Sequence, residues 1–192
     1  MPRVLRHDDP LPRHPQRVLV AGVSGAGKTT LARRVAAVTG APHTEIDALF
    51  HGPGWEPRAD FLADVRALAA RDAWTTEWQY ADARPILAQR ADLLVWLDLP
   101  FGTVTLPRLV RRTLRRRLRR EEPWNGNVEP PLWTVLTDRE HALGRATRDK
   151  LRSRVPRLEE QAPHLVVVRL RSPREVDQWV GGPLRAACRG EP

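Results

Sequence analysis

The stretch Gly22–Thr29 reads Gly-Val-Ser-Gly-Ala-Gly-Lys-Thr, a complete phosphate-binding loop of the form G-x-x-x-x-G-K-[ST]. The short apolar run before it, residues 17–21, is typical of a buried parallel strand. The Ala-, Leu- and Arg-rich residues 30–38 predict an amphipathic helix. A strand, a loop and a helix in this order place bound phosphates at a helix N-terminus, where the helix dipole favours anions.

Each position of the loop has a separate physical task. The glycines allow a tight backbone curl that points successive N–H groups at a di- or triphosphate. Lys28 can reach the β- and γ-phosphates, the Thr29 hydroxyl can ligate Mg²⁺, and Thr30 adds a hydroxyl near an α-phosphate. The expected nucleotide-binding residues are Gly22, Ser24, Gly25, Ala26, Gly27, Lys28, Thr29 and Thr30.

Strands and helices alternate along the rest of the chain. Further strands are expected at residues 43–47, 73–77, 93–98 and 165–170, and helices at 60–71, 83–90, 106–120, 133–158 and 172–180. This order predicts an α/β fold with a parallel sheet covered by helices on both faces. We expect one domain over residues 17–180, a proline-rich disordered leader over 1–16 and a tail over 181–192.

The composition narrows the classes of protein to consider. A single cysteine, Cys188, excludes a disulfide framework within one chain and favours a cytoplasmic location. The polar N-terminus does not resemble a signal peptide, and no apolar stretch is long enough to span a membrane. The net charge of +9 suggests nucleic acid as a possible partner. Only two of the 32 basic residues are lysines, however, so part of this charge reflects a general abundance of arginine.

Three carboxylates lie at the ends of predicted strands. Proteins with a parallel sheet bind their ligands at the carboxyl ends of the strands. Asp98 and Glu77 are the alternatives for supporting the metal, and each could instead be an ordinary structural or solvated acid. Asp47 could orient an acceptor or act as its general base, with Tyr80 facing the acceptor as well. Because Leu99 follows Asp98, the glutamate typical of a motor ATPase is missing, which counts against a dedicated hydrolase.

An arginine-rich helix follows the fourth predicted strand. Its arginines are Arg108, Arg111, Arg112, Arg115, Arg116, Arg117, Arg119 and Arg120, and an apolar residue recurs every fourth position from Leu106 to Leu118. Three interpretations remain open: a lid over residues 108–150 that closes on the phosphates, a nucleic-acid-binding face, or a solvated helix. For a lid, Arg115, Arg119 and Arg148 are the candidate catalytic arginines.

Several longer segments resemble one known group of proteins. They are the phosphate-binding loop, Ile46–Leu49 with Gly52–Trp55, Trp74–Tyr80, Val95–Pro100, and the arginine helix with Trp124–Asn127. Over residues 17–180 the chain resembles the adenylate-kinase-related P-loop proteins called DNA topology modulation proteins or AAA-family ATPases. The resemblance implies a three-layer P-loop fold with a five-stranded sheet of order 2-3-1-4-5, and ATP with Mg²⁺ as cofactors. Related kinases end their third strand in Asp-Gly where this chain has Glu77-Trp78, so the acceptor is expected to differ from AMP.

The sequence therefore predicts a cytoplasmic ATP-dependent kinase, a monomer or dimer, that phosphorylates an undetermined small molecule. Lys28, Asp47, Glu77 and the three lid arginines are its expected catalytic residues, and Thr29 with Asp98 its expected metal residues. A nucleotide-regulated nucleic-acid-binding ATPase and a kinase acting on an alcohol or sugar are the alternatives.

Overall fold

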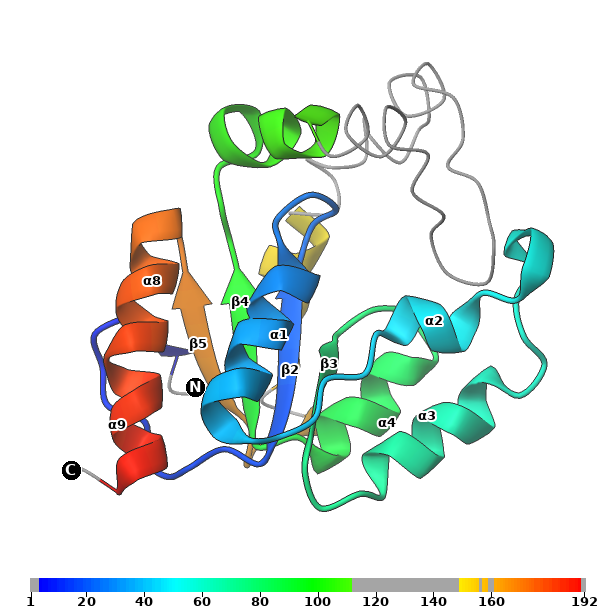
Figure 1. The fold of residues 1–192 in the computed structure, drawn as a ribbon, viewed down its shortest axis with the longest axis horizontal. Coiled ribbons are helices and arrows are strands. Elements are labelled where there is room, and N and C mark those ends of the chain that lie inside the picture. The colour runs from blue at the N-terminus through cyan, green and yellow to red at the C-terminus, as the bar shows by residue number, and fades with distance from the viewer. Residues whose placement is uncertain (1–3, 112–148, 156, 159–160, 191–192) are drawn as a thin grey trace.

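The computed structural model describes residues 4–111, 149–155, 157–158 and 161–190. Its centre is a five-stranded sheet in the order β1-β5-β4-β2-β3, in which all paired strands are parallel (Figure 1). The strands are β1 (Val4–Leu5), β2 (Arg17–Gly22), β3 (Trp74–Glu77), β4 (Leu93–Leu97) and β5 (Val166–Leu170). This arrangement confirms the predicted α/β fold, because such strands require helical crossovers.

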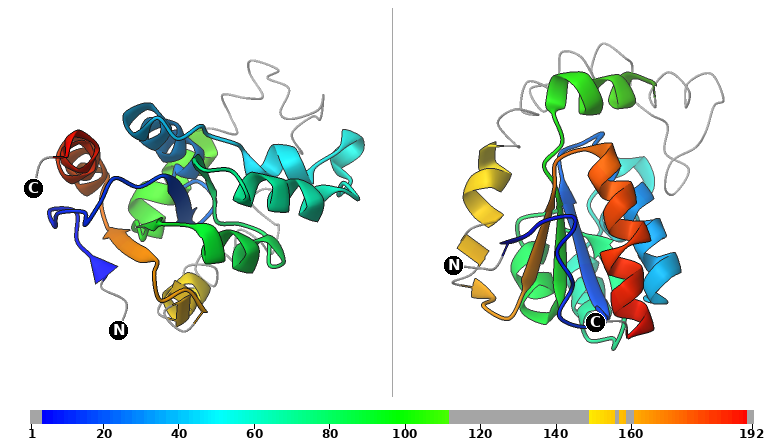
Figure 2. Two further views of the ribbon diagram at one scale, coloured as in Figure 1. Left: turned by 90° about the horizontal axis from the view of Figure 1, so that it is seen from below. Right: turned by 90° about the vertical axis from the view of Figure 1, so that its left-hand side faces the viewer.

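Helices cover both faces of the sheet. They are α1 (Lys28–Thr39), α2 (Ile46–Phe50), α3 (Phe61–Ala69), α4 (Ala83–Arg90), α8 (Pro173–Gly181) and α9 (Pro183–Arg189). A wide helical turn at Phe101–Thr105 continues into the helical residues 106–111, and residues 149–155 are helical as well. Helices α1, α8 and α9 lie on one face, while α4 and residues 149–155 lie on the other (Figure 2).

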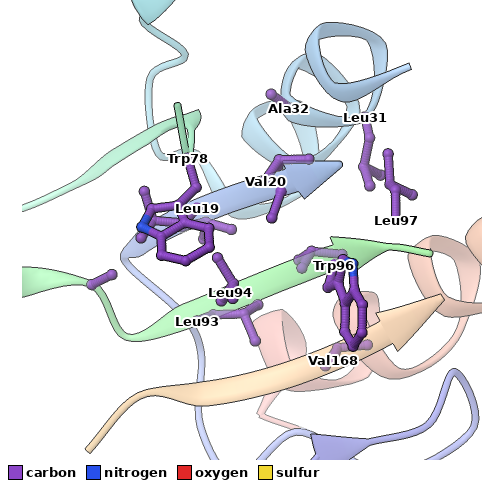
Figure 3. Packing of buried hydrophobic residues seen from close by; sticks show 14 of the residues in the cluster. Leu19, Val20, Leu31, Ala32, Trp78, Leu93, Leu94, Trp96, Leu97 and Val168 are labelled. Atoms are coloured by element: carbon purple, nitrogen blue, oxygen red, sulfur yellow. The ribbon is translucent and has the colours of Figure 1, made fainter. Parts of the chain in front are cut away.

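The core fills the space between these layers with aliphatic and tryptophan side chains. Strands β3 and β4 are buried along their whole length and β2 over residues 18–21, as expected of strands in a parallel sheet covered on both faces. Figure 3 shows Leu31 of α1 pointing toward Leu97 of β4, while Trp96 points to the opposite face. The central strands therefore hold the phosphate-binding loop on a rigid base.

The prediction of a second strand at residues 43–47 is wrong. Only His43 forms a bridge to β3, opposite Thr75, and the chain turns into α2 at Ile46. The physical reason is that the Ile46 N–H donates to the Glu77 side chain and not to a neighbouring strand. The predicted order of the other strands is confirmed in part: β3, β2, β4 and β5 are consecutive neighbours.

Both chain ends contain regular structure that the sequence did not predict. Val4 and Leu5 pair with β5 and fill the fifth place in the sheet, where we expected a disordered leader. The expected tail contains α9, whose Leu184 is fully buried. Each segment has too few apolar residues to suggest order by itself, and each is ordered by the neighbours it packs against.

Asp92 fixes the amino-terminal end of β2 against β4. Its carboxylate accepts hydrogen bonds from the backbone N–H groups of Arg17 and Gln16, at 2.9 and 3.2 Å, and from the Arg17 guanidinium at 3.1 Å. Burial alone would raise the pKa of Asp92, but these hydrogen bonds and the Arg17 charge outweigh it and lower the pKa below its ordinary value of 3.8. The ionised form is therefore stabilised by folding.

This pKa shift makes stability depend on pH. Because the folded pKa lies below the unfolded one, the stabilisation is fully present above about pH 4 and is lost as the pH falls through the folded pKa. We expect Asp92→Asn to lower the free energy of unfolding by about 1–3 kcal/mol at pH 7 and to flatten its decline below pH 4. Urea unfolding from pH 2.5 to pH 7 measures both effects. The exposed Asp72→Asn control should keep the wild-type profile, and an unchanged profile in Asp92→Asn would contradict the assignment.

Candidate active site

The phosphate-binding loop joins the end of β2 to the start of α1, as predicted. Gly25 and Gly27 have φ values of +79° and +93°, in the left-handed region that favours glycine. A Cβ added at Gly22 would lie 3.1 Å from Cβ of Leu97 and 3.2 Å from Cβ of Ala26, so a side chain here would press on both neighbours. The sequence forms this loop because glycine stands at the positions of unusual backbone and of close approach.

Lys28 and Thr29 occupy the first turn of α1. The Lys28 ammonium donates to the Val23 carbonyl oxygen at 3.4 Å, within the curl of the loop. The hydroxyl of Thr29 lies close enough to the carboxylate of Glu77 to help lower the pKa of that carboxyl. Two predicted site residues, one in the loop and one at the end of β3, are therefore adjacent.

Glu77 is the last residue of β3 and is buried. Its Oε1 lies 3.1 Å from Nε2 of His43, and its Oε2 accepts from the Ile46 N–H at 3.2 Å. Burial by itself would raise the pKa of Glu77, but the hydrogen bonds of His43, Ile46 and Thr29 and the His43 charge lower it below its ordinary value. The carboxylate is thus kept ionised beside Thr29, as a cation-binding group requires.

Asp47 begins a second polar cluster on α2. Its Oδ1 accepts two hydrogen bonds, from the Tyr80 hydroxyl at 2.7 Å and from the Gln79 amide at 2.8 Å. Within the part of the chain that the structure describes, its Oδ2 has no hydrogen-bond partner. The carboxylate is therefore held through one oxygen and presents the other.

The backbone and packing of Tyr80 hold this cluster in place. Tyr80 has a φ of +57°, which is uncommon for a bulky residue and marks a position fixed by its surroundings. Its ring stacks on Phe50 with centroids 4.0 Å apart, and its hydroxyl also lies 3.3 Å from Nε2 of His51. His51 thus lies beside the predicted acceptor residues.

The beginning of the arginine helix packs on the loop. A Cβ at Gly25 would meet Leu109 Cβ and the Thr105 carbonyl oxygen, both at 3.0 Å, so this segment touches the loop directly. Arg108 extends over the loop, with Nη1 3.9 Å from the Cβ position of Gly27. The predicted lid arginines Arg115, Arg119 and Arg148 lie outside the described residues, as does most of the proposed nucleic-acid-binding face. Arg108 could not be chosen from sequence, because nothing in an arginine-rich helix distinguishes one arginine from the next.

Asp98, the alternative metal residue, lies in a network of arginines. Arg169 of β5 donates to Oδ2 through Nε at 3.1 Å and also through Nη2, and Arg152 donates to the two oxygens at 3.4 and 3.3 Å. Arg169 lies over the Trp96 ring, on the sheet face opposite to that of Leu97 (Figure 3). Because side chains alternate along a strand, Asp98 shares the face of Trp96 and not that of α1. Its geometry favours an ion-pair role.

Trp78 and Trp55 have different surroundings. Trp78 is buried in the core, and its indole N–H donates to the Arg84 carbonyl oxygen at 3.3 Å. Trp55 packs edge-on against His51, with ring centroids 5.1 Å apart. Trp124 lies outside the described residues. Trp78 therefore contributes to folding and is not available to a ligand.

Metal-ligand clusters and membrane-spanning helices can be assessed for the described residues. No group of three or more His, Cys, Asp or Glu side chains there is arranged to hold a metal ion without other ligands. None of the helices described is long and apolar enough to cross a membrane.

Comparisons with known proteins find similarity at the level of the fold. No protein-family model matches the chain, and a search of the curated proteins finds no match. Among solved structures, a gluconokinase from Sinorhizobium meliloti 1021 is 22% identical, with a TM-score of 0.47, covering 91% of this chain and 95% of that one. A sugar kinase from Janibacter sp. HTCC2649 is 23% identical, with a TM-score of 0.45 and coverages of 86% and 90%. A shikimate kinase from Acinetobacter baumannii in complex with shikimate is 19% identical, with a TM-score of 0.47 and coverages of 91% and 89%.

Proposed function

We propose that this protein is an ATP-dependent phosphotransferase that phosphorylates a hydroxyl group of a small molecule bound beside Asp47. In this reaction the bond between the γ-phosphorus and the bridging oxygen of ATP breaks, and a bond from the acceptor oxygen to that phosphorus forms. The hydroxyl proton passes to the free Oδ2 of Asp47, and ADP leaves.

One observation carries the proposal: the carboxylate of Glu77 contacts both halves of the site. It lies beside Thr29 of the phosphate-binding loop, whose hydroxyl helps lower its pKa, and it accepts a hydrogen bond from the backbone N–H of Ile46, which directly precedes Asp47. The donor side and the acceptor side are therefore held by one buried group. A loop that only hydrolysed ATP would need no second carboxylate presented from α2.

The donor atoms beside the loop fit Mg²⁺. Thr29 supplies a hydroxyl and Glu77 an ionised carboxylate, which are the hard oxygen ligands this cation prefers. We therefore favour Glu77 over Asp98 as the residue that would hold it, directly or through water. When bound, Mg²⁺ would neutralise charge on the phosphates, while Lys28 and Arg108 would bind the same phosphates from the loop and the start of the lid.

The acceptor cluster supports a hydroxyl compound more than a nucleoside monophosphate. Asp47 is surrounded by hydrogen-bonding groups, Tyr80, Gln79 and His51, and by the ring of Phe50. The resemblance to DNA topology modulation proteins leaves the acceptor open. The nucleic-acid alternative gains no support from the residues that the structure describes.

An acceptor screen with γ-labelled ATP tests the proposal. Alcohols, sugars, nucleosides and nucleoside monophosphates are offered in parallel, and label should appear on one hydroxyl class. Asp47→Asn should lower that transfer about 10²–10⁴-fold, because the amide cannot take the proton. Affinity for ATP should change less than threefold, since Asp47 contacts the acceptor side.

The matched control is Gln79→Ala, which removes one hydrogen bond to Oδ1 but leaves the carboxylate. We expect it to lower transfer by about tenfold or less. Label appearing only as inorganic phosphate, at one rate whatever compound is added, would show an ATPase and contradict the proposal.

A further inference from the structure

A buried histidine lies against the carboxylate that joins the two halves of the site. His43 stands between α1 and α2, and the side chains of His43 and Glu77 are only 9% and 4% exposed. Its Nε2 is 3.1 Å from Oε1 of Glu77. His43 is not part of the phosphate-binding loop. The hydrogen bond of its side chain goes to Glu77 and not to the Asp47 cluster.

The second oxygen of Glu77 is held from another direction. Oε2 accepts from the Ile46 N–H at 3.2 Å, the first residue of α2. With one oxygen held by His43 and the other by the helix, the carboxylate plane has a fixed orientation relative to Thr29. Without His43, Oε1 would lose its hydrogen-bond partner, and the carboxylate could rotate about its last side-chain bond although Ile46 and Thr29 remain beside it.

We propose that His43 is a positioning residue: by holding Oε1 of Glu77, it keeps the carboxylate in the orientation that Mg²⁺-dependent nucleotide binding requires. The inference rests on the proposed function, in which Thr29 and Glu77 hold the metal. Groups that orient metal-binding side chains typically alter metal affinity or activity by about 10–100-fold when removed.

A purely structural role for His43 can be separated from this one. The segment that carries His43 is also tied to β3 by Thr76, whose hydroxyl donates to the Thr44 carbonyl oxygen at 2.7 Å. That bond holds the segment without touching Glu77. Thr76→Val is therefore a matched control that loosens the same segment and leaves the carboxylate contacts intact.

The experiment measures binding of the non-hydrolysable analogue adenylyl imidodiphosphate by calorimetry, with Mg²⁺ and with EDTA. The readout is the ratio of the two affinities. We expect His43→Ala to lower this ratio at least tenfold, with binding in EDTA changed less than twofold. His43→Gln should restore the ratio to within about threefold, because its amide nitrogen can reach the place of Nε2, whereas the shorter His43→Asn should not. Thr76→Val should keep the wild-type ratio.

Three results would overturn the inference: a wild-type ratio in His43→Ala or His43→Asn, an equal loss in Thr76→Val, or no effect of Mg²⁺ on the wild-type protein. If His43→Ala does not fold, the comparison of Asn with Gln decides the question. Adding His43→Ala to Glu77→Gln should cause no further loss, because His43 acts through Glu77. The measurement uses no acceptor, so a failed acceptor screen and a failed role for His43 remain distinguishable.

Discussion

Replacing Lys28 with alanine is expected to lower the kcat for ATP turnover by about 10²–10³-fold or more while the protein stays folded. Lys28 lies in the curl of the phosphate-binding loop, where its ammonium can neutralise the transferring phosphoryl group. A coupled assay of ADP release measures the effect. The free energy of unfolding, obtained from thermal unfolding, should change by less than about 0.5 kcal/mol.

The sequence supplies its own control, because Lys150 is the only other lysine. It is exposed in the helical residues 149–155, so Lys150→Ala should keep wild-type turnover. Normal turnover in Lys28→Ala would contradict both the proposed function and the reading of the loop. An equal loss in Lys150→Ala would instead indicate a general sensitivity to positive charge.

The second large effect is expected in stability and concerns Asp98. Its side chain is 1% exposed and pairs with Arg169 and Arg152, which are 26% and 44% exposed. Asp98→Asn would leave the partly buried Arg169 guanidinium without its counter-charge. We expect a loss of about 2–4 kcal/mol in the free energy of unfolding, less than for a fully buried pair because both arginines reach solvent. Urea unfolding measures it.

A surface ion pair provides the comparison. Arg34 and Asp177 are paired at 2.8 Å with side chains 39% and 68% exposed, so Asp177→Asn should cost no more than about 0.5 kcal/mol. The same variants distinguish the two predicted roles of Asp98. If Asp98→Asn unfolds like the wild type but binds ATP more weakly in Mg²⁺, Asp98 supports the metal and the ion-pair role is wrong.

Much of the donor side could be predicted because its signals are local. Gly25 and Gly27 are needed for backbone shape, and the strand and helix beside them have clear apolar patterns. The last residue of a predicted strand also led to Glu77, since parallel strands end at one edge of the sheet, and its adjacency to the loop follows from that edge. Asp47 was predicted at a strand end as well, but it lies on α2 and meets Tyr80 from there.

The long-range contacts that distinguish the roles of Glu77 and Asp98 could not be predicted from local patterns. His43 and Glu77 are 34 positions apart, and Asp98 and Arg169 are 71 apart. Choosing Arg169 among thirty arginines requires knowing that β5 lies beside β4. The edge strand Val4–Leu5 was missed for a similar reason, because two apolar residues form a strand only when another strand offers its edge.

The sequence by itself determined the α/β class, the phosphate-binding loop and the strand-end carboxylates, because each depends on neighbours within a few positions. Only the tertiary structure decided which carboxylate faces the loop. Asp98 and Glu77 both follow apolar strands, but the Asp98 side chain meets two arginines on the face away from α1, while Glu77 meets Thr29. Successive side chains along a strand point to opposite faces of the sheet. Which partners each side chain meets depends on the helices and strands that pack on its face.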